Sequence, residues 1–234
     1  MGQPLHDKSP AFCLVIFGSE NSFNNIDVLN RWRYVQKELN KSEITIFGFS
    51  SDADRRCLKA MRIQSGLLSS ISLENKDSPY GPYFQCKYGI HSPVYIQDAV
   101  HIGTKMKTTL LKPNVVLLME RFFVSKDFIE KLIEIHLQNL IVTVTKDKHL
   151  LCNSDLDNAD KMNFRAIDKI SSNEVIKLLH GIPESDATIQ YLQITRNIID
   201  AFLNKSSSIA DRIYKIWYST FFLRIWRSWL TCKN

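Results

Sequence analysis

Acidic residues that directly follow two strand-like runs are the positions of this sequence best suited to chemistry. Asp52 and Asp54 come after the apolar run 43–49, and Asp98 comes after the short apolar run 94–96. In open α/β sheets, ligands bind in the crevice beyond the carboxyl ends of the strands. Carboxylates at two strand ends therefore favour a binding site in that crevice.

Two roles are open for Asp52 and Asp54. Either carboxylate could cap the helix that we predict over residues 53–64, because Asp accepts backbone N–H bonds at helix starts. Alternatively, one of them binds a hard cation such as Mg²⁺, which takes oxygen ligands and only one or two carboxylates. The roles can also be divided, so that Asp52 points into the crevice while Asp54 caps the helix.

His101 follows Asp98 at a spacing of three residues, which places both on one face if the segment is helical. A histidine beside apolar residues on a helix often has only a structural role. In the alternative, its imidazole hydrogen-bonds a carboxylate and fixes the orientation of that group.

The elements that must position these residues divide the chain into an α/β part and an all-α part. Strands are predicted at 13–17, 43–49 and 94–96, with helices at 25–39 (N-cap Asn25) and 53–64. Strand, helix and strand at this spacing predict a βαβ unit with a right-handed crossover. From Asp98 on we expect helices almost throughout, at 98–111, 126–140, 173–180, 185–204 and 208–230. Ser125 is expected to open the second of these helices, Ser171 or Ser172 the third, and Ser185 the fourth. The run 140–145 is rich in β-formers and is the one exception.

The stretch GFSSDADRRCLKAM (48–61), followed by D-x-x-H at Asp98 and His101, resembles the RNase H-like (DDE) core of eukaryotic cut-and-paste transposases. In the hAT-, Mutator-, P- and Kolobok-like groups, the second catalytic aspartate ends the fourth strand. A C/D-x-x-H motif follows the fifth strand, and a helical insertion precedes the catalytic glutamate. The resemblance implies that Asp52 is the second catalytic aspartate and a metal ligand, and that Asp98 and His101 form the C/D-x-x-H motif.

The same resemblance implies a partial RNase H-like core at 11–101, a helical insertion domain at 102–234, and Mg²⁺ or Mn²⁺ as cofactor. Such enzymes use several carboxylates and two metal ions for phosphoryl transfer. We find no first aspartate on a strand-like run before Cys13 and no glutamate segment after the helical part. We therefore expect a transposon-derived, catalytically incomplete protein with weak DNA binding. The alternatives are a helical interaction protein or an active metal-dependent α/β nuclease.

Charge and composition fit DNA as a partner. The formal net charge is +6, and cations after both acidic motifs are candidates to contact phosphates: Arg55, Arg56, Lys59, Lys105 and Lys107. In the alternative, each group of cations is simply the solvated face of a helix. No Gly-rich phosphate loop follows either strand. The five cysteines form no CxxC pair, and no basic-then-apolar signal segment is present, which favours the nucleus or cytoplasm over secretion.

The stretch 216–226 is the most apolar part of the sequence and is too short to span a bilayer, so we expect no membrane partner. In the predicted helix 208–230 that contains it, the polar face drifts around the helix, and the apolar surface is wider than one contact covers. We expect an exposed patch that favours self-association. In the alternative, helices 125–139 and 185–204 bury it.

Overall fold

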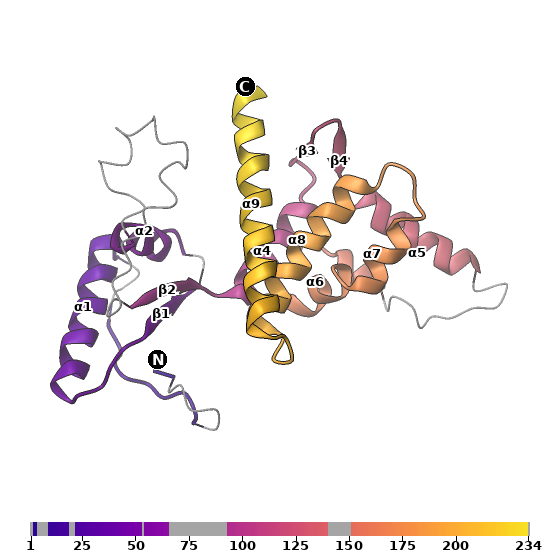
Figure 1. The fold of residues 1–234 in the computed structure, drawn as a ribbon. Coiled ribbons are helices and arrows are strands. Elements are labelled where there is room, and N and C mark those ends of the chain that lie inside the picture. Colours follow the sequence, from indigo (N-terminus) through magenta and orange to yellow (C-terminus); the bar gives the residue numbers. More distant parts are fainter. Residues whose placement is uncertain are drawn as a thin grey trace. The chain divides into compact units, whose positions relative to one another are not determined.

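The computed structural model describes residues 2–3, 9–18, 22–52, 54–65, 93–139 and 151–233. The chain is a mixed α/β protein in which helices predominate. It divides into two compact units, Met1–Asp98 and Ala99–Asn234, which are described separately below (Figure 1). The sequence placed this division between residues 101 and 102.

The first unit contains two packed helices, α1 (Asn25–Lys41) and α2 (Arg55–Gln64), close to the predicted ranges. The side chain of Asn24 accepts the N–H groups of Ile26 and Asp27, and Asp27 accepts the Asn24 N–H in return. This capping box starts α1 one residue before the predicted cap. Buried Val28 and Leu29 of α1 form a small core with Ala60 of α2.

Two parallel strands, β1 (Gly48–Ser51) and β2 (Val94–Gln97), accompany these helices, and Ser51 is in register with Gln97. The strand predicted at 43–49 begins five residues later, at Gly48. The strand predicted at 13–17 is wrong, because residues 13–18 join no sheet and Ile16 is 86% exposed. Apolar composition does not supply a ladder partner, and without hydrogen bonds to a neighbour an extended segment is no strand. The predicted βαβ unit built on that strand is therefore not formed.

Three aromatic rings hold α1 against one face of this sheet. Trp32 of α1 lies beside Phe49 of β1 and Tyr95 of β2, with ring centroids 5.4 Å and 5.3 Å apart. Phe49 and Tyr95 are cross-strand partners and stack at 5.7 Å. Burial raises the pKa of the Tyr95 hydroxyl. Such stacked pairs stabilise a sheet beyond the area that they bury.

The second unit is helical around one β-hairpin. Its elements are α4 (Ala99–Leu111), β3 (Leu117–Met119), β4 (Phe122–Val124), α5 (Asp127–Asn139), the 3₁₀-helix η2 (Asn153–Leu156), α6 (Phe164–Ile170), α7 (Asn173–Leu179), α8 (Asp186–Leu203) and α9 (Ile209–Lys233). The sequence did not predict the antiparallel hairpin β3–β4. Its two-residue turn places Glu120 at φ 54°, a conformation that usually selects Gly or Asn, so the usual turn signal is absent.

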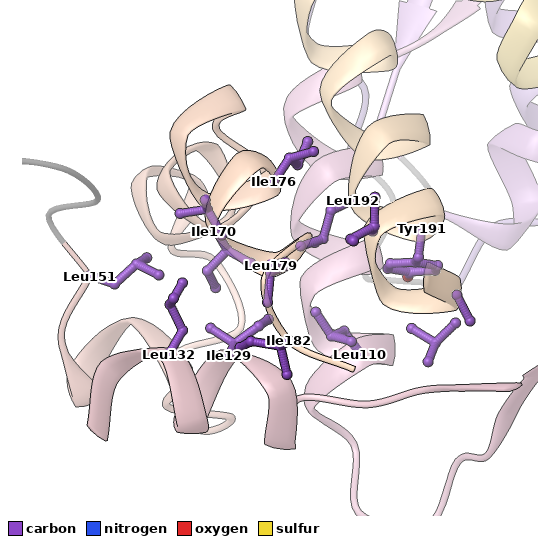
Figure 2. Close-up of a cluster of buried hydrophobic side chains, with 14 of the residues drawn as sticks. Leu110, Ile129, Leu132, Leu151, Ile170, Ile176, Leu179, Ile182, Tyr191 and Leu192 are labelled. Atoms are coloured by element: carbon purple, nitrogen blue, oxygen red, sulfur yellow. The ribbon is translucent and has the colours of Figure 1, made fainter. Parts of the chain in front are cut away.

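The core of this unit lies between α8 and its neighbours. Leu179 and Leu192 are fully buried, as is Ile170, and Figure 2 shows side chains from α5, α6, α7 and α8 converging on one cluster. Ser172 caps α7 as predicted, because its hydroxyl accepts the Val175 N–H at 3.3 Å. Ser185 opens α8 without capping it, since its hydroxyl donates to two earlier carbonyls.

The predicted strand at 140–145 lies outside the described residues. In the described part of the chain, no helix combines the length and the apolar composition needed to cross a membrane.

Candidate functional site

Asp52 and Asp98 occupy equivalent positions at the carboxyl ends of neighbouring parallel strands. Ser51 and Gln97, the last residues of β1 and β2, are paired, and each aspartate is the next residue along its strand. The Asp98 N–H donates to the Ser51 carbonyl at 2.9 Å, so the ladder continues to the acidic residues themselves. Parallel pairing thus places two carboxylate-bearing residues at one edge of the sheet.

The Asp52 side chain is exposed and shapes the turn between β1 and α2. Its Oδ1 accepts the Asp54 N–H at 3.1 Å and the Ser51 hydroxyl at 3.4 Å. Oδ1 therefore holds the turn at the end of β1, and the side chain as a whole is open to solvent.

Asp54 is the N-cap of α2. Its Oδ1 accepts the Arg56 N–H at 2.8 Å, and the Arg56 guanidinium forms an ion pair with Oδ2 at 2.9 Å. The hydrogen bond from the Arg56 side chain holds the pKa of Asp54 at about 2, well below its usual value. Asp54 is therefore the cap of α2, one of the two candidates that the sequence offered, and Asp52 shapes the turn just before it.

The predicted phosphate-binding cations have different environments. Arg55 and Lys59 are exposed on α2, and Lys105 is exposed on α4. Arg56 is bound to Asp54, and its guanidinium lies 3.7 Å from the centre of the Phe23 ring. The positive charge of Arg56 is thus partly neutralised by contacts within the protein.

Lys107 is a correction, because its side chain is not on the surface. Only 1% of the residue is exposed, and its ammonium group donates to the Asp160 carbonyl at 2.8 Å. The spacing explains the error: Lys107 lies three and four positions from the buried residues Gly103, Thr104, Leu110 and Leu111, so it shares the inward face of α4. Its aliphatic stem packs in the core while the ammonium group reaches a carbonyl oxygen.

A basic face of α1 was missed. Arg33, Lys37 and Lys41 follow one another at i, i+4 and i+8, and with Gln36 and Asn40 they line a shallow depression. Arg33, Lys37 and Lys41 are exposed, and Lys41 forms an ion pair with Glu38 at 2.9 Å. The i, i+4 recurrence of cations was visible in the sequence and could have revealed this face.

His101 is the third residue of α4 and is half-buried. Asp98 is the residue just before α4, so the D-x-x-H motif spans the start of this helix and does not lie within it. The motif also crosses the division between the two compact units, which falls after Asp98.

The residues present fit one kind of metal site better than another. Among the described residues, no group of three or more His, Cys, Asp or Glu side chains could hold a metal ion. Asp52 and Asp98 supply carboxylate oxygens at one edge, which suits a single hydrated Mg²⁺ or Mn²⁺. They do not suit a pair of ions, because a two-ion centre needs more bridging ligands.

Comparison of the chain with protein-family models, with curated proteins and with solved structures finds no match.

Proposed function

We propose that this chain is a transposase-like DNA-binding protein with a partial RNase H-like part. In this proposal Asp52 and Asp98 hold one hydrated Mg²⁺ or Mn²⁺, and cations of α1 and α2 contact DNA phosphates. The observation that carries the proposal is the Asp98 N–H to Ser51 carbonyl bond, which makes the two acidic residues neighbours at the carboxyl edge of the sheet. With this role we expect the protein in the nucleus, one of the two compartments that the sequence left open.

Binding of metal and DNA is expected to be coupled. A single Mg²⁺ held by one or two carboxylates keeps several water ligands, and phosphate oxygens are its usual further partners. When bound, the ion supplies positive charge, which offsets the repulsion between a DNA phosphate and the two carboxylates. Asp52 and Asp98 orient this charge, and without the ion they would repel the DNA backbone.

The helices of the first unit support phosphate binding because their carboxylates are already paired. Asp27 belongs to the capping box of α1, Glu38 is bound to Lys41, and Asp54 is bound to Arg56. Apart from Lys41, which pairs with Glu38, the exposed cations on these helices are Arg33, Lys37, Arg55, Lys59 and Arg62. Each exposed cation that meets a phosphate releases a counterion and strengthens binding at low salt.

DNA cleavage by this chain is not part of the proposal. Transposase-type phosphoryl transfer uses two ions that stabilise both the entering and the leaving oxygen. Two carboxylates that hold one ion stabilise a bound phosphate but do not provide this pair. The helical interaction protein and the active nuclease are the alternatives that the experiment below separates from the proposal.

The test combines Mn²⁺ binding, followed by electron paramagnetic resonance, with DNA binding, followed by fluorescence anisotropy. We expect Asp52→Asn to weaken Mn²⁺ binding by about tenfold or more, because a carboxylate ligand becomes a neutral amide. Asp157→Asn is the matched control: Asp157 is exposed and accepts the Ala159 N–H at 2.8 Å, which is the same local turn contact that Asp52 makes. Unchanged Mn²⁺ binding in Asp52→Asn would contradict the metal site.

A second arm measures the salt dependence of DNA binding. Replacing Arg55 and Lys59 together by Gln should lower the slope of log K against log salt by about 1.8, since each phosphate contact contributes about 0.9. Absence of DNA binding at low salt would favour the helical interaction protein. Mn²⁺-dependent cleavage that is lost in Asp52→Asn would favour the nuclease.

A further inference from the structure

The outward face of α9 carries a row of apolar side chains that no other described element covers. Ile209, Ile213, Trp217, Phe221 and Ile225 recur at every fourth residue and are between 41% and 77% exposed. We call these five residues the α9 stripe. The Trp217 and Phe221 rings lie 5.2 Å apart, so neighbouring members of the stripe also contact each other.

The opposite face of α9 is tied to its own unit by polar contacts. Lys215 forms an ion pair with Asp200 of α8 at 2.7 Å. The Trp226 indole N–H donates to the Leu118 carbonyl at 2.7 Å, and buried Ser219 lies on the same side. Because these contacts orient the helix, α9 cannot turn its stripe inward without breaking them.

The exposed area of the stripe is of the size that protein partners bury. A side chain of this size presents roughly 150–250 Å² when fully exposed, so five half-exposed side chains together present on the order of 500 Å². A standard stable interface buries about 800 Å² on each partner. The stripe and its exposed neighbour Tyr214 therefore supply the apolar centre of an interface, and the polar residues around them can supply its rim.

The geometry of the stripe favours an identical stripe as its partner. Residues at every fourth position form a ridge inclined to the helix axis, and two such ridges interdigitate when the helices cross at about −50°. A face that matches itself in this way forms a twofold, isologous contact. Crossing helices diverge from the contact point, so the two copies of Arg224 and of Arg227 are not forced together.

We propose that the α9 stripe is a homodimer interface, with α9 of a second copy crossing it near Trp217, the middle residue of the stripe. The interface is independent of the metal and DNA site proposed above, which lies in the other compact unit.

Sedimentation equilibrium of the 234-residue chain between about 1 and 100 μM tests the proposal. We expect a reversible monomer–dimer equilibrium for the wild type. Trp217→Ser removes the residue from both copies and should weaken dimerisation by at least about 30-fold, because a single central aromatic residue typically contributes about 2 kcal/mol or more to such an interface. The matched control is Met162→Ser, which removes a comparably exposed apolar side chain (64%) outside α9 and should leave the equilibrium unchanged.

Circular dichroism separates an interface defect from misfolding. Since Trp217 is half-exposed, the Ser variant should retain the helical signal of the wild type. A wild type that stays monomeric at 100 μM overturns the proposal. In that case, binding of wild type to neutral vesicles would identify a lipid surface as the partner of the stripe. Dimers that persist in Trp217→Ser also overturn it.

An orientation test uses cysteine pairs. In an antiparallel crossing centred on Trp217, Ile213 of one copy faces Phe221 of the other. A mixture of Ile213→Cys and Phe221→Cys chains should therefore cross-link faster under mild oxidation than either variant alone, with the disulfide identified by peptide mapping. Equal rates for the mixture and for the single variants would rule out this geometry.

Discussion

Replacing the N-cap residue Asp54 should loosen α2 without affecting the helices of the second unit. Asp54→Ala removes the acceptor for the Arg56 N–H and the carboxylate that pairs with the Arg56 guanidinium. Loss of an N-cap costs about 1 kcal/mol, within a range of roughly 0.5–2. The ion pair is partly exposed on both sides and adds only about 0.2–1 kcal/mol. The expected total is about 1–2 kcal/mol.

Hydrogen exchange followed by mass spectrometry measures this loss in α2 itself. A change of about 1–2 kcal/mol corresponds to roughly 5–30-fold faster exchange of the α2 amides. Asp54→Asn retains a capping oxygen and loses only the ion pair, so exchange should rise by at most about fivefold. Peptides from α8 provide the internal reference and should exchange as in the wild type. Exchange of α2 within twofold of wild type in Asp54→Ala would refute the reasoning.

The pH dependence of the same measurement follows from the lowered pKa of Asp54. The pKa is about 2 in the folded protein, against 3.8 for an unperturbed aspartate. A carboxyl group with a depressed pKa in the folded state stabilises that state fully above its unfolded pKa, and this contribution is lost as the pH falls towards the folded value. The difference between wild type and Asp54→Asn should therefore be constant above about pH 5 and shrink between about pH 4 and pH 2. A difference that grows on acidification would show that another group dominates.

Two further substitutions test the second unit. Lys107→Met should change the free energy of unfolding in urea by less than about 1 kcal/mol, because the loss of the hydrogen bond to the Asp160 carbonyl is offset by removing a charge from the core. A loss above about 3 kcal/mol would contradict this. Asp200→Asn should lower the free energy of unfolding by about 1.5–3 kcal/mol in the same assay, because Arg196 and Lys215 lose the charged acceptor that they share. A loss below about 0.5 kcal/mol would show that these ion pairs do not stabilise the packing of α9 on α8.

Local signals in the sequence were enough to locate the helices of the first unit. The apolar spacing of α1 and α2 and the polar residues before them predicted the start and the end of each helix to within two residues. The cap at Asp54 was also within reach, because capping depends on residues only two or three positions apart. Ser172 at the start of α7 was predictable for the same reason.

Strand pairing depended on contacts that are distant in the sequence. Residues 13–17 are β-prone, and so is the run that leads into Gly48–Ser51. Of the two segments, only Gly48–Ser51 has a hydrogen-bonded partner strand, Val94–Gln97. The turn of the β3–β4 hairpin has Glu120 in a left-handed conformation, and its sequence lacks the Gly or Asn that usually indicates such a turn. Neither outcome follows from composition, because a strand exists only through its neighbour.

The sequence by itself determined most of the helical segments, the caps of α2 and α7 to within two candidate residues each, and the positions of two carboxylates after β-prone runs. Only the tertiary structure decided that these carboxylates end adjacent parallel strands, that Lys107 is buried, and that the stripe on α9 remains exposed. Helix formation and capping are governed by groups within one or two turns of each other. Burial and strand adjacency are set by which surfaces meet after the chain has folded, so one face of α9 is buried against α8 while another, apolar face is left to solvent.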